Sequence, residues 1–145
     1  MYKYLFFDFD GVMHGEQFHC AFFSHAKMVT DRLSPYKDNF KIIISSSWRE
    51  EHGIEVLRRA FNEPLCQNVI GITPITVNGM NYHGRYLEIK QYCKIHNIKD
   101  NQWKAIDDLA RLFPEKCPQL ILTNSSTGIT PKVLDLIENF VCSAY

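Results

Sequence analysis

Residues 4–12 of the chain read YLFFDFDGV, and this stretch decides the fold that we expect. Tyr4 to Phe7 form an uninterrupted apolar run, which is typical of a strand buried on both faces of a parallel sheet. The run stops at Asp8, a second carboxylate follows at Asp10, and Gly11 comes directly after it. The chain is therefore expected to begin with a buried strand that ends in acidic side chains.

Short apolar runs alternate with longer amphipathic stretches along the remainder of the chain. This alternation is typical of βαβ units and of a parallel sheet with helices on its faces. Further strands are expected at residues 42–44, 69–73, 103–106 and 120–122, and an irregular connection at 74–83. Helices are expected at 26–33, 54–61 and 85–95, and from Pro131 onward, with Thr130 as the N-cap. The sequence thus predicts an α/β fold, and 145 residues suit a single domain that spans 1–145.

The composition is that of a globular protein without a strong overall preference for charged partners. Hydrophobic residues make up 46% and charged residues 22% of the chain, which is too apolar for a disordered protein. Lys plus Arg and Asp plus Glu number 16 each, so only a local basic patch would attract nucleic acid. No apolar run reaches the roughly 18 residues of a membrane helix, and the start lacks a signal peptide's long apolar region.

The cysteines point to a reducing compartment. They are Cys20, Cys66, Cys93, Cys117 and Cys142, an odd number with wide spacing and no C-x-x-C pair. This pattern argues against a zinc ribbon and against a complete disulfide framework. We therefore expect free thiols, mostly in the core, and a cytoplasmic protein without membrane association.

Four groups of polar residues follow expected strands or begin an expected helix. They are Asp8-x-Asp10-Gly11, Ser45-Ser46-Ser47, the neighbourhood of Arg85, and Asp107-Asp108. Open α/β sheets place their binding sites at the carboxyl ends of the strands, so these groups are expected to converge there. A turn, a loop or a helix cap would explain each group alone, and it is the order of all four that points to a site.

In this order the motifs resemble those of the haloacid dehalogenase-like (HAD) phosphatase superfamily. The likeness runs from FFDFDGV at 6–12 through KIIISSSW at 41–48 to WKAIDD at 103–108. Its most specific part is an apolar strand followed by D-x-D-G-[TV], which residues 8–12 match. The segments SSSWR at 45–49 and GIT at 128–130 are similar to the small HAD domains of RNA-repair proteins. The resemblance implies a three-layer, Rossmann-like fold, and no insertion is large enough for a cap domain.

The resemblance also implies roles for the acids. Asp8 would be the nucleophile that forms an aspartyl-phosphate, and Asp10 the general acid and base, with its backbone carbonyl on the metal. Converging carboxylates repel one another unless a cation lies between them, so Asp8 with Asp107 and Asp108 forms a hard-oxygen cluster suited to Mg²⁺. Asp107 is favoured as the direct ligand because it lies nearer the strand end, and a helix N-cap is the alternative role for the pair.

Phosphate binding in this superfamily uses a Ser or Thr at the end of the second strand and a basic residue at a helix start. For the hydroxyl we favour Ser46, with Ser45 second. For the charge we favour Arg85 at the helix start over Lys90 in mid-helix, although the family usually has Lys there. Two roles remain open for Arg49: it contacts a phosphate or nucleotide, or it is a solvated residue at a helix start.

Two ring side chains stand near these motifs. Trp48 is expected to pack against the core rather than to stack on a substrate, because a large aromatic beside a core strand usually buries itself. His14 could line the mouth of the site, but an exposed loop histidine is the favoured interpretation. Neither residue is therefore assigned a chemical role from the sequence.

The predicted activity is that of a Mg²⁺-dependent phosphatase acting on phosphoric monoesters. Without a cap, the site would be open to a nucleotide, a nucleic-acid end or another large phosphorylated substrate. A phosphotransferase on the same scaffold and a non-catalytic phospho-binding module of HAD type are the alternatives. A receiver-like signalling domain is disfavoured, because such domains place the acid pair after the first strand and the phosphorylated Asp after the third.

Overall fold

The computed structural model describes residues 1–16, 21–76 and 81–144 of the chain. At the centre of this part of the chain lies a five-stranded sheet in the order β3-β2-β1-β4-β5, in which every neighbouring pair is parallel. The strands are β1 (Lys3–Phe7), β2 (Phe40–Ile44), β3 (Val69–Ile72), β4 (Trp103–Asp107) and β5 (Leu120–Leu122). The predicted parallel α/β sheet is therefore confirmed, and the direction of winding reverses between β1 and β4.

Within the described residues, the α-helices are α1 (Ala26–Leu33), α2 (Ile54–Leu57), α3 (Gly84–Ile95) and α4 (Pro131–Cys142). Thr130 caps α4 as predicted, since its hydroxyl oxygen accepts a hydrogen bond from the backbone N–H of Val133. The helix predicted at 54–61 was too long. A 3₁₀ turn follows α2, and Phe61 then adopts extended backbone and packs edge-on against Phe7, with 5.2 Å between the ring centroids.

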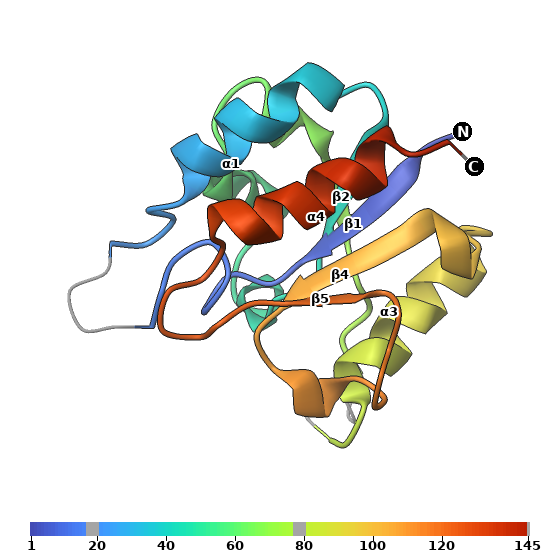
Figure 1. Ribbon diagram of the computed structural model, residues 1–145. Coiled ribbons are helices and arrows are strands. Elements are labelled where there is room, and N and C mark those ends of the chain that lie inside the picture. Colours follow the sequence, from blue (N-terminus) through green and yellow to red (C-terminus); the bar gives the residue numbers. More distant parts are fainter. Residues whose placement is uncertain (17–20, 77–80, 145) are drawn as a thin grey trace.

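The helices cover both faces of the sheet (Figure 1). α1 and α4 lie together over one face, where Val29 and Leu134 belong to the larger core cluster. α3 covers the other face, where Ile89 and Tyr92 belong to the cluster that contains Phe6 of β1. This is the three-layer arrangement implied by the resemblance, and the described residues contain no cap-sized insertion.

The sequence also predicted that the chain has no membrane helix and that its cysteines are free. Among the described residues, no helix has both the length and the apolar character needed to cross a bilayer. Cys66, Cys93, Cys117 and Cys142 are free, as predicted, and Cys20 lies outside the described residues. The expected core location holds for Cys93, whereas Cys142 is exposed. The irregular connection predicted at 74–83 includes residues 77–80, which also lie outside the described part.

Candidate active site

The carboxyl ends of four neighbouring strands carry one row of polar side chains. Asp8, Ser45 and Thr73 are the first residues after β1, β2 and β3, and Asp107 is the last residue of β4. The strand registers place all four at the same level of the sheet, and all four are buried. The residues that precede Asp8, Ser45 and Asp107 point into the core beneath α1 and α4, so these three side chains lie on the α3 side.

Arg85 reaches this row from α3. It is the second residue of the helix and is 4% exposed. Its Nη1 lies 2.7 Å from Oδ2 of Asp107 and 3.2 Å from Oδ2 of Asp8, so one guanidinium bridges acids from two strands. Burial opposes the charged form, but the carboxylates of Asp107 and Asp8 outweigh it and raise the pKa of Arg85 above its ordinary value. The residue therefore stays charged beside the acids.

Asp108 joins Asp8 and Asp107 in a cluster at this edge. One carboxylate oxygen of each residue lies within 4.8 Å of the other two. Oδ2 of Asp108 accepts a hydrogen bond from Ser125 at 2.6 Å, whereas its Oδ1 is buried with no hydrogen-bond partner among the described residues. Gly11 borders the cluster with φ at +74°, and a Cβ there would lie 2.3 Å from Oδ2 of Asp108, so a side chain would displace the acid.

The charges of this cluster are unbalanced. Burial raises the pKa of Asp8 well above its ordinary value, and the charge of Asp107 raises it further, while Arg85 opposes both effects. Burial likewise raises the pKa of Asp107 against the lowering effect of Arg85. Three carboxylates thus share the charge of one guanidinium, and one buried oxygen is unsatisfied. This set of oxygen donors fits a divalent cation such as Mg²⁺.

Ser45 and Ser46 occupy different environments. Ser46 is the N-cap of the 3₁₀ helix Ser47–Glu50, where its hydroxyl accepts a hydrogen bond from the N–H of Trp48 at 3.3 Å. Ser45 lies in the polar row, and its hydroxyl is buried without a hydrogen-bond partner in the described part of the chain. Thr73, its neighbour in the row, is in the same condition. Because buried hydroxyls require a partner, the geometry favours Ser45 over Ser46 as a phosphate donor, the reverse of the order given from the sequence.

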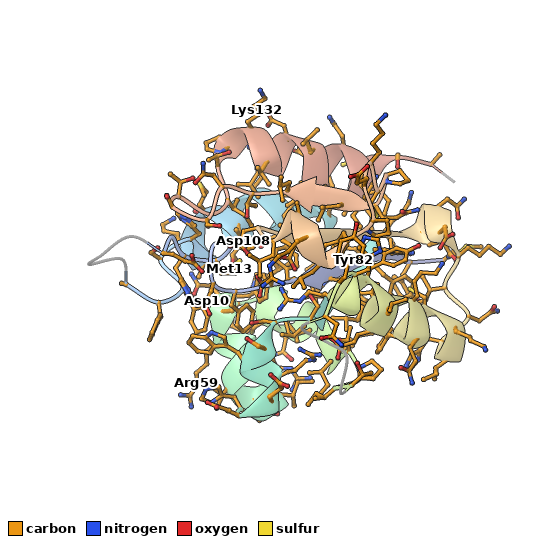
Figure 2. The ribbon with its side chains drawn as sticks, turned by 90° about the horizontal axis from the view of Figure 1, so that it is seen from below. Asp10, Met13, Arg59, Tyr82, Asp108 and Lys132 are labelled. Carbon is orange, nitrogen blue, oxygen red and sulfur yellow. The ribbon has the colours of Figure 1, made fainter. Side chains whose placement is uncertain are left out.

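Asp10 is held from two sides by ring N–H groups. His14 Nε2 lies 2.7 Å from its Oδ1, and Trp48 Nε1 donates to its Oδ2 at 3.1 Å. Nδ1 of His14 accepts a hydrogen bond from the backbone N–H of Phe23, so the proton of the neutral ring lies on Nε2 and faces Asp10. The side chain of Asp10 is 48% exposed and lies near that of Asp108 in the view of Figure 2.

This arrangement corrects one sequence interpretation and adds to another. His14 is 3% exposed, so the favoured interpretation of an exposed loop residue was wrong. Trp48 does pack against other rings, as expected, including Phe23 at 5.1 Å between centroids. It also donates to Asp10, a polar role that the sequence did not indicate. We refer to His14 and Trp48 together as the Asp10 clamp.

Arg49 is neither solvated nor available to a phosphate. It is 6% exposed, and its guanidinium pairs with Glu88 of α3 at 2.9 Å. The remaining N–H groups donate to the backbone carbonyls of Ser45, Ser46, Thr73 and Pro74. All five donors of the fork are therefore occupied. The solvated interpretation was wrong, and the contacts indicate that Arg49 holds the ends of β2 and β3 in place.

Lys90 lies at the opposite edge of the sheet. Its ammonium group pairs with Asp100, which precedes β4, whereas the acidic cluster follows β4. The hydrogen bond to Asp100 raises the pKa of Lys90 more than partial burial lowers it. This location removes Lys90 from the candidate phosphate site and leaves Arg85 as the basic residue there.

The loop after β5 packs against the loop after β1. The hydroxyl of Thr123 donates to the carbonyl of Gly11 at 2.6 Å, and the N–H of Ile129 donates to the carbonyl of Val12 at 2.8 Å. Gly128 has φ at +71°, and a Cβ there would lie 2.6 Å from the carbonyl oxygen of Val12. The GIT segment therefore braces the turn that follows Asp10.

A comparison with known protein families identifies the family of the chain. The family described as the HAD domain in Swiss Army Knife RNA repair proteins matches residues 4–134. The chain belongs to this family. The match covers β1 through the first part of α4, and so includes every candidate residue of the HAD site. No curated protein matches the chain.

The sequence missed Thr73 and underestimated His14. Thr73 follows an apolar run in the same way that Asp8 does, so the rule that located Asp8 could also have located Thr73. His14 had no such signal, because its contact with Asp10 depends on the conformation of a loop and on the N–H of Phe23.

Proposed function

We propose that this HAD-family chain is a Mg²⁺-dependent phosphomonoester hydrolase that works through an aspartyl-phosphate on Asp8. Membership of the family supports hydrolase-type chemistry in general. The convergence of Asp8, Asp107 and Asp108 beside Arg85 carries the finer proposal, because it combines a buried nucleophile with the donors of a cation site.

Asp8 attacks the phosphorus in the first step, and the bond from phosphorus to the ester oxygen breaks. Arg85, 3.2 Å from Asp8, offsets negative charge on the phosphate, and the unpartnered hydroxyl of Ser45 is available to donate to it. Asp8 and the pair Asp107 and Asp108 would hold Mg²⁺, with the Asp10 carbonyl added by analogy with the family. When bound, the ion would neutralise further charge on the phosphate.

Asp10 supplies the proton that the leaving oxygen needs. It then takes a proton from the water that attacks the aspartyl-phosphate, so that phosphate is released and Asp8 is regenerated. The Asp10 clamp supports this assignment, because hydrogen bonds from His14 and Trp48 fix both carboxylate oxygens. A non-catalytic phospho-binding module would have no need of such a group, and we therefore favour the enzyme.

The open site leaves room for substrates of different sizes. The described residues contain no cap-sized insertion over Asp8, so a nucleotide or a nucleic-acid end could approach it. A phosphotransferase would use the same first step and differ only in the acceptor that takes the phosphoryl group from Asp8. Release of inorganic phosphate, measured with and without added alcohols, distinguishes the two.

Hydrolysis of p-nitrophenyl phosphate tests the proposal. We expect activity that requires Mg²⁺, is abolished by EDTA, and falls about 10⁴-fold or more in Asp8→Asn. Lys90→Ala, at the opposite edge of the sheet, serves as the control and should retain the wild-type rate. Hydrolysis by Asp8→Asn at the wild-type rate would show that the covalent mechanism is wrong.

A further inference from the structure

A groove of about 460 Å³ adjoins the exposed side of Asp10. Its described lining includes the rings of Phe22, Trp48 and His52 and the carboxylates of Asp10, Glu50 and Glu51. The proposed acid must come within about 2.6–3.2 Å of the oxygen that leaves, so the part of the substrate beyond that oxygen must extend from Asp10. The groove is therefore continuous with the place where the leaving group has to be.

The rings in the groove are packed against one another and leave Phe22 exposed. Phe22 is 70% exposed, yet its ring meets Trp48 edge-on with 5.2 Å between centroids and lies equally close to the ring of His14. Trp48 is in turn anchored to Asp10 through its indole N–H. Such a cluster of rings offers a planar ring a contact that a flexible alkyl group cannot match.

The charge of the groove is negative. Three of its described lining residues are carboxylates, and no Lys or Arg occurs among the described lining residues. Arg85 lies in the buried row beside Asp8, where it faces the transferred phosphate. A second phosphate on the leaving group would thus meet carboxylates without a compensating basic side chain in this lining.

We propose that this groove binds the leaving group of the substrate, and that it selects a planar aromatic ring with no phosphate other than the one transferred. The inference rests on the proposed function, since it takes Asp10 as the acid. It narrows the substrate class to monophosphates of aryl alcohols or of single nucleosides, in preference to sugar phosphates and bisphosphates.

A matched pair of substrates isolates the ring. Adenosine 5′-monophosphate and ribose 5-phosphate share the same ester, and only the first has a base. With Mg²⁺ we expect KM for the nucleotide to be about tenfold lower than KM for ribose 5-phosphate. Where turnover is slow, Ki for inhibition of acetyl phosphate hydrolysis takes the place of KM. Phe22→Ala should raise KM (or Ki) for the nucleotide about fivefold and leave KM (or Ki) for ribose 5-phosphate unchanged.

Controls separate the ring contact from a general disturbance. Tyr82→Ala removes another exposed ring, which lines a different hollow, and should change neither value (Figure 2). Ribose 5-phosphate has no base but needs the acid, so a fall in its kcat in Phe22→Ala would mean that the variant displaces Asp10 and would count against the ring contact. Equal values for the nucleotide and ribose 5-phosphate in the wild type, or a preference for phosphocholine over the nucleotide, would overturn the inference.

The charge is tested with adenosine 3′,5′-bisphosphate. We expect it to bind about tenfold more weakly than the monophosphate, and the double variant Glu50→Gln with Glu51→Gln to narrow that gap, whereas Glu115→Gln should not. A bisphosphate bound as tightly as the monophosphate would contradict the selection.

Acetyl phosphate also separates the two proposals. Asp8-dependent hydrolysis of acetyl phosphate without any ring preference would overturn the groove assignment and leave the proposed function in place. Absence of Asp8-dependent hydrolysis of every substrate would overturn both.

Discussion

The two halves of the candidate site are built from different material. The phosphate half consists of Asp8, Ser45, Arg85, Asp107 and Asp108. The leaving-group half consists of Asp10, His14, Phe22 and Trp48. In the first half, side chains come from strand ends and from α3, and Asp8, Arg85 and Asp107 are each at most 4% exposed. In the second half they come from the segments that follow β1 and β2, and the exposure ranges from 3% for His14 to 70% for Phe22.

The difference shows how the work of such a site can be divided. Charges interact most strongly where water is excluded, so in the proposed mechanism the buried half meets the phosphate, which is the chemically constant part of the substrate. The variable part of the substrate would be met by loops, which can change without disturbing the sheet. Perturbing the two halves should therefore have different kinetic consequences.

The largest difference is expected for Asp10→Asn. Because the amide cannot donate the proton that a poor leaving group needs, kcat for ribose 5-phosphate should fall about a hundredfold. Acetyl phosphate, whose leaving group needs little assistance, should lose much less in the bond-breaking step. Single-turnover rates with the two substrates measure this, and equal losses for both would argue against the acid role of Asp10.

Removal of the Asp10 clamp should have a smaller effect of the same kind. His14→Ala frees Oδ1 of Asp10, and we expect kcat for ribose 5-phosphate to fall about tenfold through misplacement of the acid. Because His14 is only a positioning residue in this proposal, single-turnover cleavage of acetyl phosphate should change little. A loss independent of the leaving group would instead point to a general structural defect.

In the phosphate half, a comparison of Ser45→Ala with Ser46→Ala shows which hydroxyl donates to the phosphate. Ser45→Ala removes a hydroxyl that is free for the substrate, so KM should rise about fivefold for every phosphate ester. Ser46→Ala removes an N-cap, so it should lower the free energy of unfolding by about 1 kcal/mol and change KM less. The opposite outcome would restore the ranking given from the sequence.

The smallest expected effect concerns stability without metal. Since burial raises the pKa of Asp8, the folded chain binds that proton more tightly than the unfolded chain does. The resulting contribution to the free energy of unfolding is present when the pH is below 3.8, the ordinary pKa of Asp, and it is lost as the pH rises through the pKa of Asp8 in the folded chain. Asp8→Asn should therefore stabilise the metal-free chain by about 1 kcal/mol at neutral pH.

Mg²⁺ should act in the same direction on the wild type. By neutralising the cluster, the ion should raise Tm more at about pH 8 than at about pH 5. The rise in Tm should be smaller in Asp8→Asn than in the wild type. Calorimetry at the two pH values with and without the ion provides the measurement. An equal rise in Tm at both pH values would contradict the linkage to Asp8.

The phosphate half could be located largely from the sequence. Asp8 and Asp107 each stand at the end of an expected strand, and parallel strands bring their carboxyl ends to one edge whatever the loops do. Arg85 could be chosen over Lys90 because a helix start faces that edge and mid-helix positions do not. The structure favours Ser45 where the sequence favoured Ser46, because the choice depends on where the chain leaves the strand and forms a cap.

The leaving-group half was largely beyond such reasoning. His14 meets Asp10 only because the chain turns at Gly11 and returns to place Phe23 N–H against the ring. Trp48 was expected to pack, and it does, but its indole N–H was not assigned a partner. These contacts join segments that have no periodic pattern, and sequence periodicity is the signal on which the prediction depends.

The brace between the loops after β5 and β1 bears on how the protein is made. Every proposed catalytic group has been synthesised once Asp108 is in place, yet Thr123 and Ile129, which hold the turn at Gly11, are added later. The turn that follows Asp10 is therefore held by residues more than a hundred positions further along the chain, so a chain that stops after Asp108 would contain the candidate groups without the contacts that hold this turn.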